Sequence, residues 1–341
     1  MAPVFHSHDD RETTAAGVLL DSIDIRDGSI LVAHDSSGRV ARELIKRGCQ
    51  VDPWWRMQQG GCAATPWPSG GPYDAATLRL SKDKGAFEMA LHAIASRIRP
   101  GGNIWVYGAN DEGIKSAPKR LSTVCDSVST VGTKRHCRVL EGQTPSSPQS
   151  LRENLSDWRQ TVTLNFSTGP ISQHSYPGVF AKGKLDPGTA FLLTRLPTPK
   201  PNSTILDYAC GSGVIAQGLL AVEPSVNVTL IDADAIAIEA AKRNVPAGRA
   251  LVGYDLTTLN RDDTFDLIVA NPPYHQGKER SDTVVMSLIE QSPHHLSADG
   301  DLWLVLQRQV NIRKALNQVF SSVNCTNEGA YNVWHARSPH P

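Results

Sequence analysis

The feature that most constrains the fold is an internal repeat, because both halves of this 341-residue chain carry the same succession of short apolar runs and amphipathic segments. Three pairs of segments correspond, namely residues 29–38 with 203–213, 73–76 with 265–268, and 100–106 with 298–304. Apolar runs that alternate with amphipathic helices indicate βαβ units, since parallel strands need a long crossover between them. The sequence therefore predicts an α/β protein made of two tandem Rossmann-like domains. A chance likeness between two unrelated α/β domains is the alternative, because all such folds share this rhythm.

A stretch rich in Pro, Ser, Gln and Thr, residues 141–150, lacks apolar periodicity and separates the two halves. It predicts one domain over residues 15–150 and a second domain over residues 160–341. In the second domain we expect a mostly parallel sheet of seven strands flanked by helices. The expected strands are 204–207, 226–232, 250–252, 265–270 and 301–306, followed by a hairpin of 324–328 and 331–336, and the expected helices are 214–221, 235–243, 283–291 and 310–320.

Charge and cysteine content narrow the class of protein. Thirty-four basic residues balance thirty-four acidic ones, so contact with nucleic acid has to come from a local patch. The sequence contains no apolar run of about 18 residues that would predict a membrane span, and its polar, acidic start does not read as a signal peptide. The six cysteines contain no C-x-x-C pair, which favours reduced thiols. We therefore expect a cytoplasmic protein without a bound metal.

A glycine-containing turn predicts a nucleoside site. Residues 207–213 read DYACGSG and lie where an expected strand ends and a helix begins. Glycine permits a tight turn and the close approach of a ligand, and open α/β sheets bind nucleosides at this edge. Asp207 precedes the turn and suits a cationic amino group, which favours S-adenosylmethionine over NAD. A purely structural turn is the alternative.

Two further acids follow neighbouring strands. Asp232 ends the next expected strand, about twenty residues past the glycines, where a carboxylate reaches ribose hydroxyls. Asp255 is placed to accept from an adenine amine, and a solvated loop acid is the alternative for it. The candidate cofactor-binding residues are Asp207, Ala209, Cys210, Gly211, Gly213, Asp232, Ala233, Asp255 and Asn271.

The motif of Asn271, Pro272, Pro273 and Tyr274 follows the expected strand 265–270 at the same edge of the sheet. An exocyclic amine spreads its lone pair into the base and is a poor nucleophile toward a sulfonium methyl group. The side-chain carbonyl of Asn271 and the backbone carbonyl of Pro272 can accept both amine hydrogens and so localise the lone pair. Proline fixes the backbone that aims the second carbonyl, and Tyr274 would stack on a flipped-out base. The motif therefore predicts N-methylation, with a simple Asn-Pro turn as the alternative.

With these two motifs the sequence resembles the class I methyltransferases and, among them, the tandem-domain ribosomal RNA guanine-N2 methyltransferases of the RsmC and RlmG type. The resemblance covers nearly the whole chain and includes PGVF at 177–180 and LDPGT at 185–189. It implies S-adenosylmethionine as cofactor, a guanine N2 amine as acceptor and ribosomal RNA or a ribosomal subunit as partner. It also implies Phe180, Lys182 and Asp186 at the lip of the pocket, where loop packing is the alternative. Ala209 departs from the family, which has glycine there.

The resemblance further implies a degenerate first copy. Val32 stands opposite Asp207, and residues 76–79 take the place of the motif at 271–274. The first domain has therefore lost the chemistry and would serve folding or RNA binding. Within 24 residues it carries six basic residues and one acid, which predicts phosphate contacts, although a solvated face is the alternative. The candidate RNA-binding residues are Lys115, Lys119, Arg120, Lys134 and Arg135, with Arg138 in the same segment.

Transfer of a methyl group to guanine N2 in ribosomal RNA is the function that these observations favour, by a protein that we expect to be monomeric. The same four-residue motif also serves adenine-N6 enzymes and enzymes that methylate protein glutamine, but the decayed first copy argues against both. A non-catalytic RNA-binding assembly factor is a further alternative. The residues of both motifs are intact, which argues against this alternative. A factor of that kind would lack affinity for S-adenosylmethionine.

Overall fold

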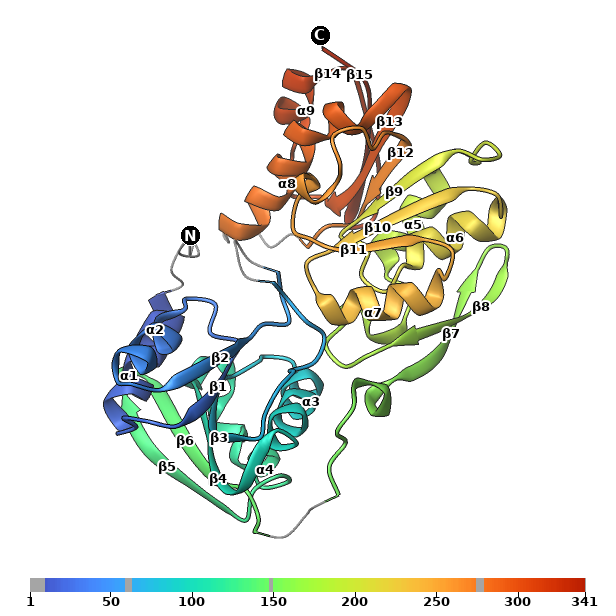
Figure 1. Cartoon of the computed structure of the whole chain (residues 1–341). Helices are drawn as coiled ribbons and strands as arrows, with labels where there is room; N and C mark the ends of the chain where they lie inside the picture. The colour runs from blue at the N-terminus through green and yellow to red at the C-terminus, as the bar shows by residue number, and fades with distance from the viewer. Residues whose placement is uncertain (1–9, 59–62, 147–149, 274–278, 341) are drawn as a thin grey trace. The chain divides into compact units, whose positions relative to one another are not determined.

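The computed structural model describes residues 10–58, 63–146, 150–273 and 279–340, and it divides the chain into two compact units (Figure 1). The first unit ends at Arg159 and the second begins at Gln160. Each unit has its own sheet with helices packed on both faces, so the predicted two-domain α/β fold is confirmed.

A seven-stranded sheet forms the centre of the second unit. Its strands, in the order in which they lie side by side, are β11 (Arg249–Val252), β10 (Asn227–Asp232), β9 (Thr204–Tyr208), β12 (Phe265–Ala270), β13 (Leu296–Gln307), β15 (Tyr331–Pro339) and β14 (Phe320–Glu328). The strands from β11 to β13 pair parallel with one another. β15 runs antiparallel to both of its neighbours. The prediction of a mostly parallel sheet is therefore confirmed.

Helices cover both faces of this sheet, α5 (Pro187–Arg195), α6 (Val214–Val222) and α7 (Ala235–Asn244) on one face, and α8 (Glu279–Gln291) and α9 (Arg313–Val319) on the other. Leu192 and Ile215 share a buried cluster with Val269 of β12. Leu288 belongs to a different cluster, which contains the neighbouring Ile268. Because successive side chains of a strand point to opposite faces, these clusters are the two core layers of an α/β sandwich.

Short elements complete the second unit, namely the hairpin of β7 (Gln160–Phe166) and β8 (Gly169–Ser175) and the single turns η4 (Phe180–Gly183), η5 (Leu256–Thr258) and η6 (Ser292–His295). The sequence did not predict the hairpin. The helix predicted over residues 310–320 is wrong at both ends, since α9 begins at Arg313 and Phe320 opens β14. Ile312 stands four residues before the buried Leu316 and so continues the helical spacing, but Val310 and Ile312 are both buried in the loop before α9.

The first unit holds a six-stranded sheet, in the order β2 (Gln50–Trp54), β1 (Ser29–Ala33), β3 (Tyr73–Arg79), β4 (Ile98–Ala109), β6 (Cys137–Gln143) and β5 (Ser127–Lys134). One face carries α1 (Asp10–Ser22) and α2 (Arg39–Lys46), and the other carries α3 (Lys84–Ala95) and α4 (Pro118–Leu121) (Figure 1). The turns η1 (Asn110–Glu112), η2 (Ile114–Ser116) and η3 (Leu155–Trp158) also belong to this unit.

Every strand of the first sheet has a counterpart in the second. In spatial order, β2, β1, β3, β4, β6 and β5 correspond to β10, β9, β12, β13, β15 and β14. Among the described residues, the first unit has no counterpart of β11. The match extends to side chains. The N–H of Ser29 donates to the Asp74 carboxylate at 2.7 Å, as the N–H of Thr204 donates to Asp266 at 2.9 Å. The pairings β3–β4 and β12–β13 also share a shift of register at the same place. This shared detail supports an internal duplication.

Candidate active site

The turn of residues 207–213 joins β9 to α6 through three residues with left-handed backbone. Ala209 and Gly211 both have φ of 54°, and Gly213, which precedes the first residue of α6, has φ of 80°. Glycine adopts this conformation without the steric cost that other residues meet. A Cβ at Gly213 would also lie 3.2 Å from Leu230. The turn is therefore tight and brings bare backbone to the carboxyl edge of the sheet.

Asp207 lies at the base of this turn and is completely buried. Its Oδ2 accepts a hydrogen bond from the N–H of Ala216 at 3.1 Å, whereas no described residue donates to its Oδ1. Burial raises the pKa of this carboxyl to about 8, and the nearby charge of Asp232 adds to the rise. A buried acceptor without a donor is costly, so the geometry favours a ligand that supplies one.

The other two predicted acids are held by backbone donors. Asp232 accepts from the N–H groups of Gly211 and Asp234, both at 2.8 Å, and so ties the end of β10 to the glycine turn. Asp255 accepts from the N–H of Thr257 at 3.1 Å and caps η5. The same Oδ1 of Asp255 also accepts from the hydroxyl of Thr257. Contacts of these acids with ribose and adenine remain predictions.

Asn271 follows β12 directly and reaches the beginning of α5. Its Nδ2 donates to Oδ2 of Asp186 at 3.0 Å and to Oγ1 of Thr189 at 2.8 Å. Asp186 also caps α5 by accepting from the N–H of Thr189 at 2.9 Å. Pro272 is buried and Pro273 is exposed, and Tyr274 lies outside the described residues. The structure thus brings Asn271 of the predicted catalytic motif into direct contact with the segment 185–189.

The glycine turn and Asn271 line one pocket, formed by Phe180, Ala181, Lys184, Asp186, Thr189, Ala209, Cys210, Gly211, Ser212, Val214, Ile215 and Asn271. Phe180 stands at its mouth with 59% of its surface exposed. Lys182 belongs to η4, but its side chain lies outside the described part of the structure. The other predicted residues lie at the same edge of the sheet but do not line this pocket, namely Asp207 near the end of β9, Asp232 at the end of β10, Ala233 directly after it and Asp255 after β11.

Sequence reasoning missed Thr189, which also contacts Asn271, and several other residues of the pocket, namely Ala181, Lys184, Ser212, Val214 and Ile215. Thr189 stands three residues after Asp186, the spacing of an N-cap and the helical residue whose N–H it accepts. That spacing is typical of a helix start, which the sequence analysis did not predict here, and it gives no sign of a contact with Asn271, which lies 82 residues further along the chain.

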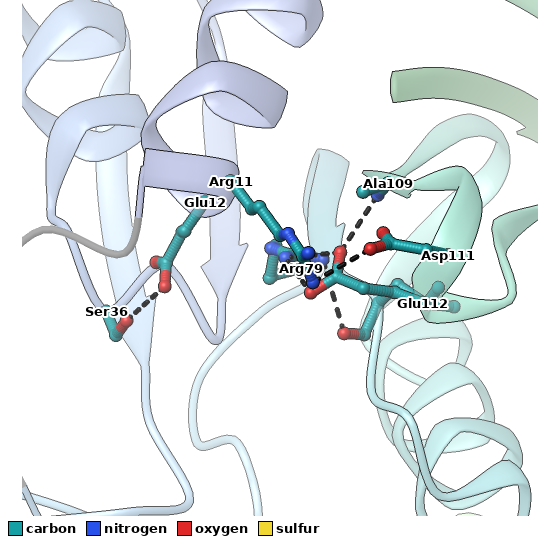
Figure 2. Close-up of polar contacts among 8 residues, drawn as sticks. Arg11, Glu12, Ser36, Arg79, Ala109, Asp111 and Glu112 are labelled. Carbon is teal, nitrogen blue, oxygen red and sulfur yellow. Dashed lines mark hydrogen bonds and ion pairs between the residues drawn. The ribbon is translucent and has the colours of Figure 1, made fainter. Parts of the chain in front are cut away.

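The corresponding position in the first unit carries a buried ion pair. Ala33 pairs with Leu78 in the first unit, and the equivalent Tyr208 pairs with Ala270 in the second. Arg79 follows Leu78 as Asn271 follows Ala270, so Arg79 takes the place of Asn271. The prediction that residues 76–79 replace the motif is therefore wrong by three positions, because β3 continues through Arg79. Arg79 binds both carboxylate oxygens of Glu112, at 2.7 and 2.6 Å, within side chains that are 8% and 6% exposed (Figure 2).

A side chain of α1 also fills the turn of the first unit. The Glu12 carboxylate accepts from the hydroxyl of Ser36, which takes the place of Gly211 (Figure 2). It also accepts from the N–H of Ser37 at 2.9 Å. Trp55 stands where the second unit has Asp232, and its indole N–H donates to the carbonyl of Asp35 at 3.1 Å. The first unit thus lacks both the open turn and a carboxylate at the position of Asp232, in agreement with a degenerate copy.

The predicted basic residues of the first unit come from three places. Lys119 and Arg120 lie on α4, where Arg120 contacts Glu88 at 3.7 Å. Lys134 and Arg135 lie at the tip of the β5–β6 hairpin, beside α1 on the other face of the sheet, and Lys134 contacts Asp21 of α1 at 3.3 Å. Lys115 belongs to η2, just after β4. These residues therefore do not form one continuous patch.

Among the described residues, no group of three or more His, Cys, Asp or Glu side chains could hold a metal ion. No helix in the described ranges combines the length and apolar character that a membrane span requires.

Comparison with known proteins agrees with this architecture. A family model described as "Methyltransferase small domain" matches residues 171–335, and one described as "Methyltransferase small domain N-terminal" matches residues 57–161. The chain matches a solved structure titled as a T. thermophilus 16S rRNA N2 methyltransferase (RsmC) in complex with AdoMet and guanosine. The TM-score is 0.83 at 21% identity, over 95% of this chain and 91% of the other, which establishes the shared fold.

Two relatives carry the name ribosomal RNA small subunit methyltransferase C. The protein of Ectopseudomonas mendocina is 32% identical, and that of Stutzerimonas stutzeri is 30% identical. Each match covers 84% of this chain and 88% of the relative. At this identity and coverage, the chain belongs to the family of ribosomal RNA small subunit methyltransferase C.

Proposed function

We propose that this protein transfers a methyl group from S-adenosylmethionine to the N2 amine of a guanine in the ribosomal RNA of the small subunit. The observation that carries the proposal is the single pocket in which the glycine turn after β9 meets Asn271 after β12. A cofactor held at the turn would present its reactive group beside the amide that binds the target amine. Membership of the methyltransferase family supplies the class of substrate.

The residues present fit S-adenosylmethionine. The unpartnered Oδ1 of Asp207 suits a ligand that brings a donor, as the cofactor's ammonium group does. Asp232 would accept from the ribose hydroxyls and Asp255 from the adenine amine. Gly211 leaves space on its open side, since a Cβ there would meet only Phe180, at 3.9 Å. When bound, the cofactor supplies an electrophilic methyl group on a sulfonium.

The protein's own contribution is to aim and localise the lone pair of the target amine. The carbonyl of Asn271 and the backbone carbonyl of Pro272 would each accept one amine hydrogen, which favours a pyramidal nitrogen whose lone pair points at the methyl group. Pro273 fixes the backbone next to the second carbonyl. The exposed ring of Phe180, at the mouth of the pocket, is placed to stack on a base that has left its helix.

The hairpin tip of the first unit is the part that we propose contacts RNA phosphates. Arg135 and His136 both have left-handed backbone, with φ of 50° and 60°, a conformation that costs about 1 kcal/mol or more in residues other than glycine. They line a cavity of about 420 Å³ with Asn110 and Arg11. Both side chains are exposed, and Arg135 has no ion-pair partner among the described residues. This tip is therefore a better candidate for phosphate contact than α4, where Arg120 is paired.

We also propose a monomer that works in the cytoplasm. Every residue of the pocket comes from one unit of one chain, so no second copy is needed to complete it. Cys49, Cys125, Cys137, Cys210 and Cys325 are free thiols, as a reducing compartment maintains.

Methylation of small-subunit particles and of their naked RNA with labelled S-adenosylmethionine tests the function. Particles from a strain that lacks the gene should accept one methyl group, which digestion and mass spectrometry should locate on guanine N2. Asn271→Ala should keep cofactor affinity and lose about a hundredfold or more in transfer rate, whereas Asp207→Ala should weaken cofactor binding itself. Label found on adenine N6 or on protein glutamine, or an absence of affinity for the cofactor, would overturn the proposal.

A further inference from the structure

We infer that Asp186 and Thr189 are positioning residues that fix the side-chain amide of Asn271 in one orientation, with its carbonyl oxygen free to accept a hydrogen bond from the target amine. The inference rests on the proposed function, because it concerns how the motif at 271–273 reads the substrate. The sequence predicted Asp186 as a substrate contact at the lip of the pocket. The inference instead gives Asp186 a role that acts through Asn271.

The argument begins with the donors of the amide. A side-chain amide has two N–H donors on one side and an acceptor on the other, so its orientation decides what it can bind. Both donors of Asn271 are used, one by Asp186 at 3.0 Å and one by Thr189 at 2.8 Å. No described residue donates to the Oδ1 of Asn271, and Asn271 is one of the residues that line the pocket.

The reverse orientation is excluded by the chemistry of Asp186. An ionised carboxylate only accepts hydrogen bonds, so a flipped Asn271 would place two acceptor oxygens about 3 Å apart. Asp186 cannot turn away easily, because the same Oδ2 caps α5 through the N–H of Thr189. Thr189 is 5% exposed, which leaves little water to compete for its hydroxyl. The beginning of α5 therefore acts as a rigid holder for the amide.

This orientation has a consequence for recognition. A pocket that offers a carbonyl oxygen binds a group that donates, as the exocyclic N2 amine does, and disfavours the O6 edge of guanine, which only accepts. The charge of Asp186 also polarises the amide that it binds, and chains of hydrogen bonds of this kind strengthen one another. Asn271 should thus be a stronger acceptor than an isolated amide.

Thr189→Val is the decisive variant, because it removes the hydroxyl while keeping size and branching. We expect a fall of about tenfold in the single-turnover rate on small-subunit particles at saturating cofactor, with cofactor affinity and melting temperature unchanged. Thr189→Ser should restore the rate. Thr194→Val is the matched control, since Thr194 lies on the same helix and donates only to the carbonyl of Phe191, and it should leave the rate unchanged.

A double-mutant cycle separates positioning from general support of the fold. If Thr189 acts through Asn271, then Thr189→Val combined with Asn271→Ala should transfer methyl groups at the rate of Asn271→Ala alone. A combined variant that is a further tenfold slower would mean that Thr189 acts elsewhere, and would overturn the inference. A wild-type rate for Thr189→Val would overturn it as well.

Asp186→Asn and Asp186→Ala test the second partner. Asparagine can still cap α5 and still accept from Asn271, so it should slow transfer less than alanine does, and equal effects of the two would contradict the assignment. The outcomes also separate this inference from the proposed function. A near-normal rate for Asn271→Ala would refute the catalytic role of Asn271, whereas an impaired Asn271→Ala beside a normal Thr189→Val would refute only the positioning.

Discussion

A buried carboxylate supports the turn after the first strand of each unit, but from different positions. In the second unit Asp207 of β9 accepts from the N–H of Ala216, and in the first unit Asp35 of the turn accepts from the N–H of Ala41, each at 3.1 Å. The second oxygen of Asp35 accepts from the Ser37 hydroxyl at 2.8 Å, whereas that of Asp207 has no described donor. Support for the helix is thus common to both units, and only Asp207 keeps an oxygen available for a ligand.

The raised pKa of Asp207 predicts a pH-dependent stability. Below about pH 4 both the folded and the unfolded chain carry this proton. As the pH rises from about 4 to about 8, only the unfolded chain releases it, so the folded state loses stability over this window. Between pH 5 and pH 8 the loss amounts to about 4 kcal/mol at most. Asp207→Asn should flatten this part of the curve of unfolding free energy against pH, measured with urea, and an unchanged slope would show that Asp207 ionises normally.

The same carboxyl links cofactor affinity to pH. A cationic ammonium beside Oδ1 favours the charged carboxylate, so binding should release the proton below about pH 8. The affinity for S-adenosylmethionine should therefore rise between pH 6 and pH 8, and calorimetry in buffers of different ionisation enthalpy should detect the proton. The loss of this dependence in Asp207→Asn is the control. An affinity that stays constant with pH in the wild-type protein would place the ammonium elsewhere.

At the scale of elements, an unpredicted hairpin supports the cofactor turn. Asn244, at the end of α7, donates to the carbonyls of His174 in β8 and Ser212 in the turn, both at 2.8 Å. It also accepts from the N–H of His174 at 2.7 Å. One side chain therefore joins the hairpin of β7 and β8, the helix α7 and the turn that would hold the cofactor.

Asn244→Ala should leave three backbone groups without partners and reduce the free energy of unfolding by about 2 kcal/mol. Because one of these groups belongs to Ser212, affinity for the cofactor should fall too. Asn227→Ala is the control, since that side chain makes one exposed bond, to the carbonyl of Asn202, and it should have little effect. Chemical denaturation and calorimetry measure the two effects, and equal results for both variants would contradict this role.

The sequence predicted elements best where local chemistry marks their ends. β12 ends where Asn271 and Pro272 follow, and α7 begins after the capping residue Asp234, so both boundaries could be read locally. The start of α9 could not, because the buried Ile312 before it continues the helical spacing of Leu316. Thr189 was missed for a different reason, since its partner Asn271 is 82 residues away and only the paired sheet brings them together.

At the scale of the whole molecule, the same topology occurs twice, but the two units differ in whether side chains occupy the site at the carboxyl edge of the sheet. In the second unit the carboxyl edge of the sheet keeps an open pocket. In the first unit Glu12 and the pair of Arg79 and Glu112 occupy the equivalent positions with side chains of the same unit. Because its own side chains occupy this site, we expect the first unit not to bind the cofactor there and to serve RNA through its surface.

The proposal that the first unit binds RNA can be tested at the tip of the β5–β6 hairpin. Arg135 is an exposed cation without an ion-pair partner among the described residues, so Arg135→Gln should remove one phosphate contact. Binding to small-subunit RNA should weaken similarly for different RNA sequences, and the slope of log affinity against log salt should fall by about 1. The slope is the informative quantity, since a general loss of structure would lower affinity without reducing the number of released counterions in this way.

Lys46→Gln is the matched control, because Lys46 is an exposed cation of the same unit that contacts Glu43 at 3.7 Å. If both variants bind RNA with the salt slope of the wild-type protein while methyl transfer stays normal, the first unit does not grip RNA through this tip, and its remaining role is to support the fold.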